Sequence, residues 1–389
     1  MTVWNNIIAV IRREFGILRR RPIYLVGSVG VLIFCSVFFL TFFGKGLPDK
    51  LPIGIVDCDD SSMSRNLCQQ LDATQLGSTI KYSSFAEARQ DMQSGKICAV
   101  CVIPEGMYAD VSANRRPTFS YYLNGLYYVG GSLAYKDVLQ MINLVNGAVQ
   151  RKVLYAKGVS EYQAMNMLRP VNIDTHQIGN PYTNYGYYIS NIMLPGILGM
   201  IVIIVLIYSL GTELKYGTSR HLMKTAGDSI MTALTGKLIV FTVLFSILGL
   251  GLMDLLYHWM HFPIEGSIWN MFIAVLLFVL ANEAIAILII GCFPIPRLAL
   301  SIGALYSVLG ISLSGFSLPL EAMPAWFHGP AQLFPLRHYY QFYVQEVIFG
   351  TGFAGWYKEA VCMLLFLFLP FLVLNRLKGA YVNQNYPKD

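Results

Sequence analysis

The sequence predicts an α-helical integral membrane protein with six transmembrane helices and a large extracytoplasmic α/β domain inserted between helices 1 and 2. Three observations predict it. Charged residues make up only 13% of the 389 residues, whereas a soluble globular domain averages about 25%. Several apolar runs reach the roughly 17–25 residues that cross a bilayer as a helix. A long stretch of ordinary polarity, residues 44–186, separates the first two of these runs.

The chain opens with a basic segment, residues 1–22, that carries five arginines. It lacks the short apolar core and small-residue cleavage site of a signal peptide. We therefore expect the first apolar run to remain in the protein as an anchor. The six predicted membrane helices are 23–43, 187–210, 238–257, 268–292, 298–316 and 356–374.

Lys and Arg gather in the segments that six crossings put on one side of the membrane: residues 1–22, the loop 211–237, Arg297 and the C-terminal tail. The connection 254–266 has neither residue. By the positive-inside rule, this asymmetry places both termini and the loop in the cytoplasm. The net charge of +6 is therefore explained by topology, and no basic cluster on a soluble module indicates nucleic-acid binding.

The segment 44–186 is large enough for one compact domain. Apolar strand patterns alternate in it with amphipathic helix patterns, which predicts a small α/β sheet. In chain order we expect strand 51–57, helix 61–72, a second helix ending at Gly95, strand 97–104, strand 118–124, and one or two long helices over 132–168 before a break at Pro170.

Four of the seven cysteines lie in this domain: Cys58, Cys68, Cys98 and Cys101. Cys98 and Cys101 form a C-x-x-C. In a strand, residues three positions apart point to opposite faces of the sheet, which argues against a redox or metal site. A Cys58–Cys68 disulfide is one alternative, and small buried thiols are the favoured one.

Asp57, Asp59 and Asp60 form an acidic cluster. We interpret it as the end of a strand followed by a helix N-cap rather than as a metal site.

No motif for chemistry is present. Gly236-Lys237 is followed by Leu238 and has Met231 where a nucleotide-binding P-loop needs its first glycine. No catalytic or metal-ligating residue is predicted. Glu283, in the fourth membrane helix, is a costly intramembrane carboxyl. It is either a substrate-pathway or proton site, or a carboxyl that fixes helix packing.

The loop from Glu213 to Lys237 lies between the second and third predicted membrane helices. Gly227-Asp228-Ser229 is a helix break with a good N-cap. After it, Ile230, Met231 and Leu234 form one apolar face of a predicted short helix over 228–236. Such a helix either lies in the membrane interface or docks into a groove of a soluble partner.

Four quoted stretches carry a family resemblance. "ELKYGT" followed by "GKL" in the loop resembles the second-span loop of ABC-type-2 exporter permeases, and "REFGILRRRPIY" is similar to their cytoplasmic amphipathic elbow helix. "LPIGIVDCDDSSMSRNLCQQLDA" with "EARQDMQSGKICAVCVIPEGM" resembles the external domain of the drug-exporter branch, and residues 313–352 resemble the connection between the fifth and sixth spans. Thr225 is followed by Ala226-Gly227 where the family often has proline, and Glu283 is not expected from the family pattern.

The resemblance implies a permease subunit of a bacterial, multidrug-type exporter in the inner membrane. It would pair with a second copy or a paralogue, move a hydrophobic or amphipathic substrate outward, and depend on separate ATPase subunits; the chain itself would bind no cofactor, since ATP sits on the partner. A periplasmic adaptor is left open. The implied ATPase-coupling residues are Glu213, Gly217, Thr218, Asp228, Ile230, Leu234, Gly236 and Lys237.

The external region 317–355 is rich in proline, and non-helical backbone near membrane depth is tolerated where it is buried or lines a wet cavity. Arg337 and His338 join Glu283 as candidates for the substrate pathway. Two other functions compete with transport. One is a membrane-anchored receptor or scaffold with a ligand-binding external domain, and the other is a membrane enzyme that uses Glu283, Arg337 or His338.

Overall fold

The computed structural model describes residues 3–44, 46, 50–74, 77–113, 115, 117–125, 128–168, 178–180 and 184–384. The chain forms two compact units. A helical unit comprises Met1–Gly44 and Gln177–Asp389, and an α/β unit, Lys45–His176, is inserted into it. The two units are described separately.

The helical unit is built from helices of very different lengths. They are α1 (Val3–Arg20), α2 (Pro22–Leu25), α3 (Val31–Phe42), α9 (Tyr185–Lys215), α10 (Ser219–Thr225), α11 (Ile230–Met253), α12 (Ile268–Cys292), α13 (Pro296–Ser312), α14 (His328–Ala331), α15 (Pro335–Tyr343), α16 (Phe353–Leu365) and α17 (Leu374–Asn383). A π-helical segment, Val26–Gly30, joins α2 to α3, and a 3₁₀ helix, η7 (Phe366–Leu372), continues α16.

Among the described residues, five helices are long and apolar enough to cross a membrane: Pro22–Phe42, Tyr185–Lys215, Ile230–Trp259, Ile268–Cys292 and Phe353–Leu372. The span expected at 298–316 corresponds to α13, which is apolar but only 17 residues long. Helix α13 stops early because Gly315 adopts a left-handed conformation with φ +92° and the Ser314 hydroxyl bonds back to the carbonyl of Ile311.

Helices α9 and α12 form the centre of the helical unit. In each of them, 72% of an apolar stretch of 18 residues is buried, against 22–28% of such a stretch in the other three long helices. Small residues let these helices approach closely. A Cβ on Gly199 of α9 would lie 2.7 Å from the ring of Phe278 on α12. The outer helices therefore present most of their apolar surface to their surroundings, as membrane helices do.

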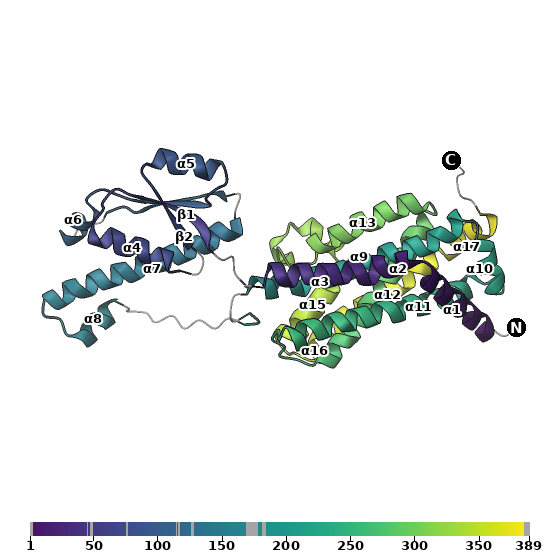
Figure 1. Ribbon diagram of the computed structural model, residues 1–389. Coiled ribbons are helices and arrows are strands. Elements are labelled where there is room, and N and C mark those ends of the chain that lie inside the picture. The colour runs from purple at the N-terminus through teal and green to yellow at the C-terminus, as the bar shows by residue number, and fades with distance from the viewer. Residues whose placement is uncertain are drawn as a thin grey trace. The chain divides into compact units, whose positions relative to one another are not determined.

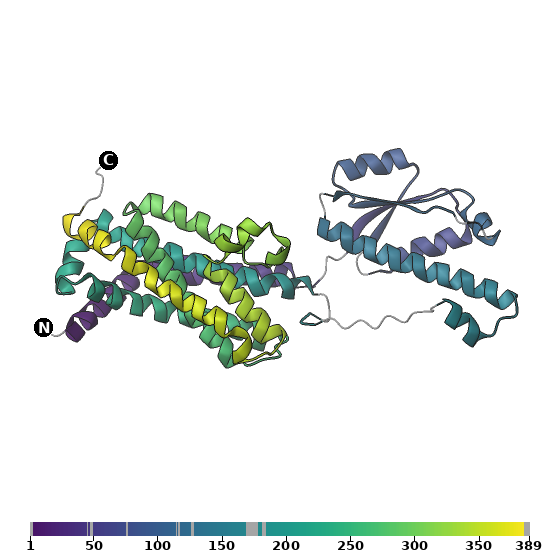
Figure 2. The same cartoon turned by 180° about the vertical axis from the view of Figure 1, so that it is seen from behind.

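Helices α1, α10 and α17 lie together at one end of the helical unit, which we call the loop end (Figure 1). Helices α15 and α16 lie toward the opposite end. From behind, the yellow C-terminal part of the chain runs along the unit and ends with α17 at the loop end (Figure 2). The loop end thus gathers segments that are far apart in the sequence.

The α/β unit contains a four-stranded sheet of order β2-β1-β3-β4. The strands are β1 (Leu51–Asp57), β2 (Gly77–Tyr82), β3 (Ala99–Ile103) and β4 (Ser120–Leu123). β1 pairs in parallel with β2 and β3, and β4 pairs antiparallel with β3. The helices are α4 (Ser62–Asp72), α5 (Phe85–Gln93), α6 (Met107–Ser112), α7 (Tyr128–Ala156) and α8 (Glu161–Leu168).

The sheet is covered on both faces. Alternate strand residues such as Ile53 and Ile55 pack with α4 and α7, whereas Val56 and Val100 pack with α5 on the other face (Figure 1). Burial on both faces explains why the central strands are nearly continuous apolar runs.

The sequence missed β2. Its residues "GSTIKY" are half-exposed or exposed except at Gly77, because β2 is an edge strand of the sheet. The expected strands and helices at 51–57, 61–72, 97–104 and 118–124 are confirmed within a few residues. The long helical segment is two helices, α7 and α8, separated at Gly158, whose φ is +75°.

The acidic cluster makes the expected turn. Asp57 Oδ1 accepts hydrogen bonds from the backbone N–H groups of Asp59 and Asp60, each at 3.1 Å. Ser61 then caps α4 by accepting from the N–H of Ser64. Among the described residues, no group of His, Cys, Asp and Glu could hold a metal ion.

All seven cysteines are free, including Cys58 and Cys68. Cys58 is exposed, while Cys68, Cys98 and Cys101 are buried. Cys98 donates to the carbonyl of Pro52, and burial raises the pKa of the Cys101 thiol to about 12. Since the thiolate is the reactive form, Cys101 is an inert packing residue rather than half of a redox pair.

This burial predicts a labelling pattern. With a polar maleimide between pH 7 and 9, Cys58 of the native protein should be labelled and Cys101 should stay unlabelled, because a thiol with a pKa of about 12 remains protonated throughout that range. Peptide mass spectrometry measures both sites, and protein unfolded in detergent and urea is the control in which both react. Equal labelling of Cys101 and Cys58 in the native protein would contradict the packing described.

Candidate functional site

The loop between α9 and α11 is built by glycine and capping residues. Gly217, with φ +69°, ends α9. Gly227 and Asp228, with φ +67° and +59°, end α10. Ser229 then caps α11 by accepting a hydrogen bond from the N–H of Thr232. These residues turn the chain twice within a short distance at the loop end.

The short helix of this loop differs from the one expected. It is α10, Ser219–Thr225, whereas 228–236 is not a separate helix. Helix α11 begins at Ile230 and continues without a break to Met253, because no residue after the Ser229 cap interrupts it. Ile230 and Leu234 are consequently buried, 7% and 4% exposed, and offer no apolar face to a soluble partner.

Four charged side chains meet beneath this loop. Arg13 and Glu14 come from α1, Glu213 from the end of α9 and Lys237 from α11; we call them the charge cluster. Arg13 holds Glu213 with two parallel bonds, Nη1 to Oε1 at 2.8 Å and Nη2 to Oε2 at 2.9 Å. Lys237 Nζ lies 2.6 Å from Glu14 Oε2 and 3.3 Å from Glu213 Oε1. Arg13 also contacts Glu14.

The cluster is buried and electrically balanced. Glu14, Glu213 and Lys237 are 0%, 3% and 1% exposed. Burial by itself lowers the pKa of Arg13, but the bond to Glu213 and the charges of Glu213 and Glu14 outweigh it, so the pKa is raised above its ordinary value. Removing one partner from such a buried pair costs about 3–5 kcal/mol, because the other charge is left uncompensated.

Further contacts attach the neighbouring segments to the cluster. The Thr218 hydroxyl donates to Glu213 Oε2 at 2.5 Å, which fixes the start of the loop. Ser219 donates to the carbonyl of Tyr381 in α17, and the Tyr381 hydroxyl donates to the carbonyl of Leu210 in α9. The loop end is therefore cross-linked by polar contacts between α1, α9, α10, α11 and α17.

Gly236 lets α1 approach α11. A Cβ at this position would lie 2.7 Å from Val10 Cβ and 3.1 Å from the carbonyl oxygen of Ile7. Beside the cluster, a cavity of about 450 Å³ is lined by residues that include Arg12, Arg20 and Arg21.

The structure thus brings several predicted coupling residues together. Glu213 and Lys237 are in the charge cluster, Thr218 binds it, and Gly236 packs against α1. Gly217 and Asp228 are exposed turn residues. The sequence did not single out Arg13 and Glu14. Glu14 could have been found as an acidic residue one turn from Val10 and Leu18 on the buried face of α1.

The three substrate-pathway candidates do not share one site. Glu283 on α12 accepts a hydrogen bond from Thr242 on α11 at 2.7 Å. His338 on α15 lies 2.7 Å from Glu359 Oε2 and 2.9 Å from the carbonyl of Gln332. Arg337 is 8% exposed, and its Nε and Nη1 atoms have no hydrogen-bond partner in the described part of the chain.

Glu346 is a buried carboxylate that the sequence did not single out. Its Oε1 accepts from the backbone N–H of Ser267 at 2.7 Å and from the side chain of Asn270 at 2.8 Å. These donors lie at the N-terminus of α12, where a negative charge is favoured by the helix dipole. Glu346 therefore holds the N-terminus of α12 in place.

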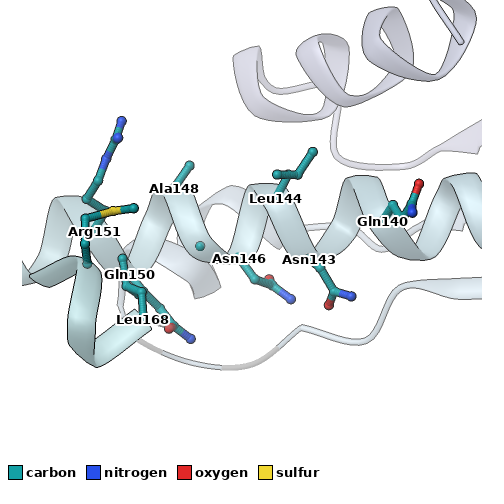
Figure 3. Close-up of a pocket in the computed structure, with 10 residues that line it drawn as sticks. Gln140, Asn143, Leu144, Asn146, Ala148, Gln150, Arg151 and Leu168 are labelled. Carbon is teal, nitrogen blue, oxygen red and sulfur yellow. The ribbon is translucent and has the colours of Figure 1, made fainter. Parts of the chain in front are cut away.

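The α/β unit has a separate cavity of about 730 Å³ between α7 and α8. Figure 3 shows Asn143, Asn146 and Gln150 pointing to the same side of α7, at helical spacing. Arg151 is the charged residue among those that line it. Amides that both donate and accept suit polar, uncharged groups.

A family model described as "ABC-2 family transporter protein" matches residues 22–375 of the chain. The match includes α9, α10 and α11, and it leaves out α1 and nearly all of α17. No curated protein matches the chain.

The contact between α1 and α11 predicts opposite effects of one substitution at two glycines of α11. Gly236→Ala should destabilise the protein by about 1–3 kcal/mol, because the added methyl overlaps Val10. Gly251→Ala, where an added Cβ would meet no described atom within 4 Å outside its own stretch of helix, should stabilise the protein by up to about 1 kcal/mol through helix propensity. Thermal unfolding in detergent measures both. A shift of the same sign for the two variants would contradict the docking of α1 at Gly236.

Proposed function

Because this chain belongs to the ABC-2 transporter family, we propose that it is the permease subunit of an ATP-driven exporter of hydrophobic or amphipathic substrates. The family is one of membrane transport subunits that work with ATPase subunits. The proposal adds outward direction, placement in a bacterial inner membrane with both termini in the cytoplasm, α13 as a sixth span, and assembly with a second copy or paralogue. ATP binds to the partner ATPase in this proposal.

The charge cluster is the observation that carries the proposal. It joins α1, α9 and α11 through buried ion pairs at the loop end, where the chain also exposes the short helix α10. A force applied to α1 would move the long helices with it, since separating them breaks a buried ion pair. A force on α10 would reach the cluster through the hydrogen bond from Thr218, at the start of α10, to Glu213. This arrangement suits a handle on which a soluble ATPase acts.

Helix α10 is the proposed contact with the ATPase. His221 and Lys224 are exposed on it, while Leu222 and Met223 anchor it in the core. The exposed flanks of α10, Tyr216 to Thr218 and Gly227 with Asp228, extend this surface. The role first assigned to Ile230 and Leu234 passes to these residues, and Ile230 and Leu234 instead hold α11 in place.

The α/β unit is external in this topology, and the cavity between α7 and α8 supports binding of a ligand or a periplasmic adaptor there. The same cavity favours the competing function, a membrane-anchored receptor. The two functions differ in whether a soluble ATPase binds α10.

Co-purification tests the proposal. Tagged full-length protein, extracted from its native membrane in mild detergent, should capture a soluble ATPase that mass spectrometry identifies. The variant His221→Glu/Lys224→Glu should capture it about tenfold less, because it reverses the charge of the proposed contact without disturbing buried residues.

The matched control is Lys157→Glu/Lys358→Glu, which changes one exposed residue of the α/β unit and one of α16. It should capture the ATPase as the wild type does. Equal capture by the α10 variant would remove α10 as the contact. Absence of any ATPase from intact wild-type protein would favour the receptor function.

A further inference from the structure

The cavity beside Glu283 is the feature of the membrane helices that their packing leaves unexplained. It has a volume of about 410 Å³, within the range of drug-sized ligand sites. Its walls come from the first turns of α11, the middle of α12, and η7 with the start of α17. Apart from Glu283 and Thr235, the lining residues are apolar: Met231, Leu234, Leu238, Leu280, Ala284, Ile287, Leu367, Phe368, Pro370, Phe371 and Leu374.

Glu283 lines this cavity with a carboxyl group that is only half satisfied. Its side chain is buried, at 2% exposure for the residue. Oε2 accepts from Thr242, but Oε1 is buried without a hydrogen-bond partner among the residues that the structure describes. Within the described part of the chain Glu283 forms no ion pair, and Lys237 of α11 is engaged by Glu14 and Glu213. A buried carboxyl with an empty acceptor is costly, so it indicates a missing partner.

The lining limits what that partner can be. A metal ion such as Mg²⁺ or Ca²⁺ needs several oxygen ligands, and the cavity offers one carboxyl and one hydroxyl. An apolar body with one positive charge fits better, because the walls bury the body and the carboxylate meets the charge. Phe368 and Phe371 add ring faces, which attract organic cations.

We propose that this cavity binds a hydrophobic monocation, such as a substituted ammonium compound, with Glu283 as its counter-ion. The ligand enters from the bilayer, since Met231 and Phe368 at the cavity are 44% and 65% exposed on the outer surface of the helical unit. The 3₁₀ segment η7, with Pro370 inside it, forms the movable wall, because a 3₁₀ stretch within a helix often marks a hinge. The inference rests on the proposed export function for its physiological meaning, but binding itself does not require the ATPase.

Ethidium, an aromatic monocation, and Nile red, a neutral dye, are the probes. Fluorescence titrations use full-length protein in nanodiscs of zwitterionic lipid, without ATPase. Glu283→Gln keeps an acceptor for Thr242 and removes the charge, so ethidium should bind about tenfold more weakly while Nile red binding stays unchanged. Glu265→Gln, at an exposed position, is the matched control and should bind both dyes as the wild type does.

A second variant guards against misfolding. Leu280→Trp fills the cavity from a partly exposed position, keeps the carboxyl, and should weaken both dyes. The proposal is overturned if Glu283→Gln binds ethidium like the wild type, or if it loses Nile red equally. Glu283-dependent binding by a protein that captures no ATPase would leave the site standing and remove the export function, so the two failures are distinguishable.

Discussion

The charge cluster is the interaction on which the loop end depends. Glu14, Glu213 and Lys237 are buried, Arg13 is partly buried, and each of the four touches at least one opposite charge from another helix. If α1, α9 or α11 moved away from the other two helices, at least one buried charge would lose its ion-pair partner. Apolar packing of α1 alone would be less specific, because many apolar helices can slide along one another. The ion pairs fix the register of Arg13 and Glu14 on the membrane helices.

The charge cluster fixes one end of the helical unit, and a second polar contact fixes the other. At the loop end, α9 is tied to α1 and α11, and α9 is also one of the two most buried helices. At the other end, Glu346 holds the start of α12, the second central helix. In the proposed function, motion at the loop end would reach the centre of the unit through α9, while Glu346 would hold the far end of α12. Between these two fixed ends, Glu283 keeps a carboxyl oxygen free at a cavity.

Local pattern predicted much of the fold, and long-range contacts decided the rest. The strand at 51–57 and the membrane helix at 268–292 follow from apolar runs with clear ends, and the structure places both at those residues. The strand β2 lacks such a run because it lies at the edge of the sheet. Glu213 and Lys237 were singled out by the loop resemblance. Their partners Arg13 and Glu14 lie some 200 positions away, and no local pattern encodes that pairing. The prediction of a separate short helix over 228–236 was wrong. The apolar residues of this stretch form the buried start of the long helix α11, and a short docking helix would show the same local pattern.

A double-mutant cycle between Glu14 and Lys237 tests the account most directly. Unfolding free energies are measured for the wild type, Glu14→Gln, Lys237→Met and the double variant under the same conditions in detergent. Each single variant should lose about 3–5 kcal/mol, because the cluster of two cations and two anions is left with one unbalanced buried charge. The double variant removes both charges and retains the Arg13–Glu213 pair, so it should lose less than the sum by about 2 kcal/mol or more. Additive losses would show that Glu14 and Lys237 do not interact, and would contradict the charge cluster as the link between α1 and the membrane helices.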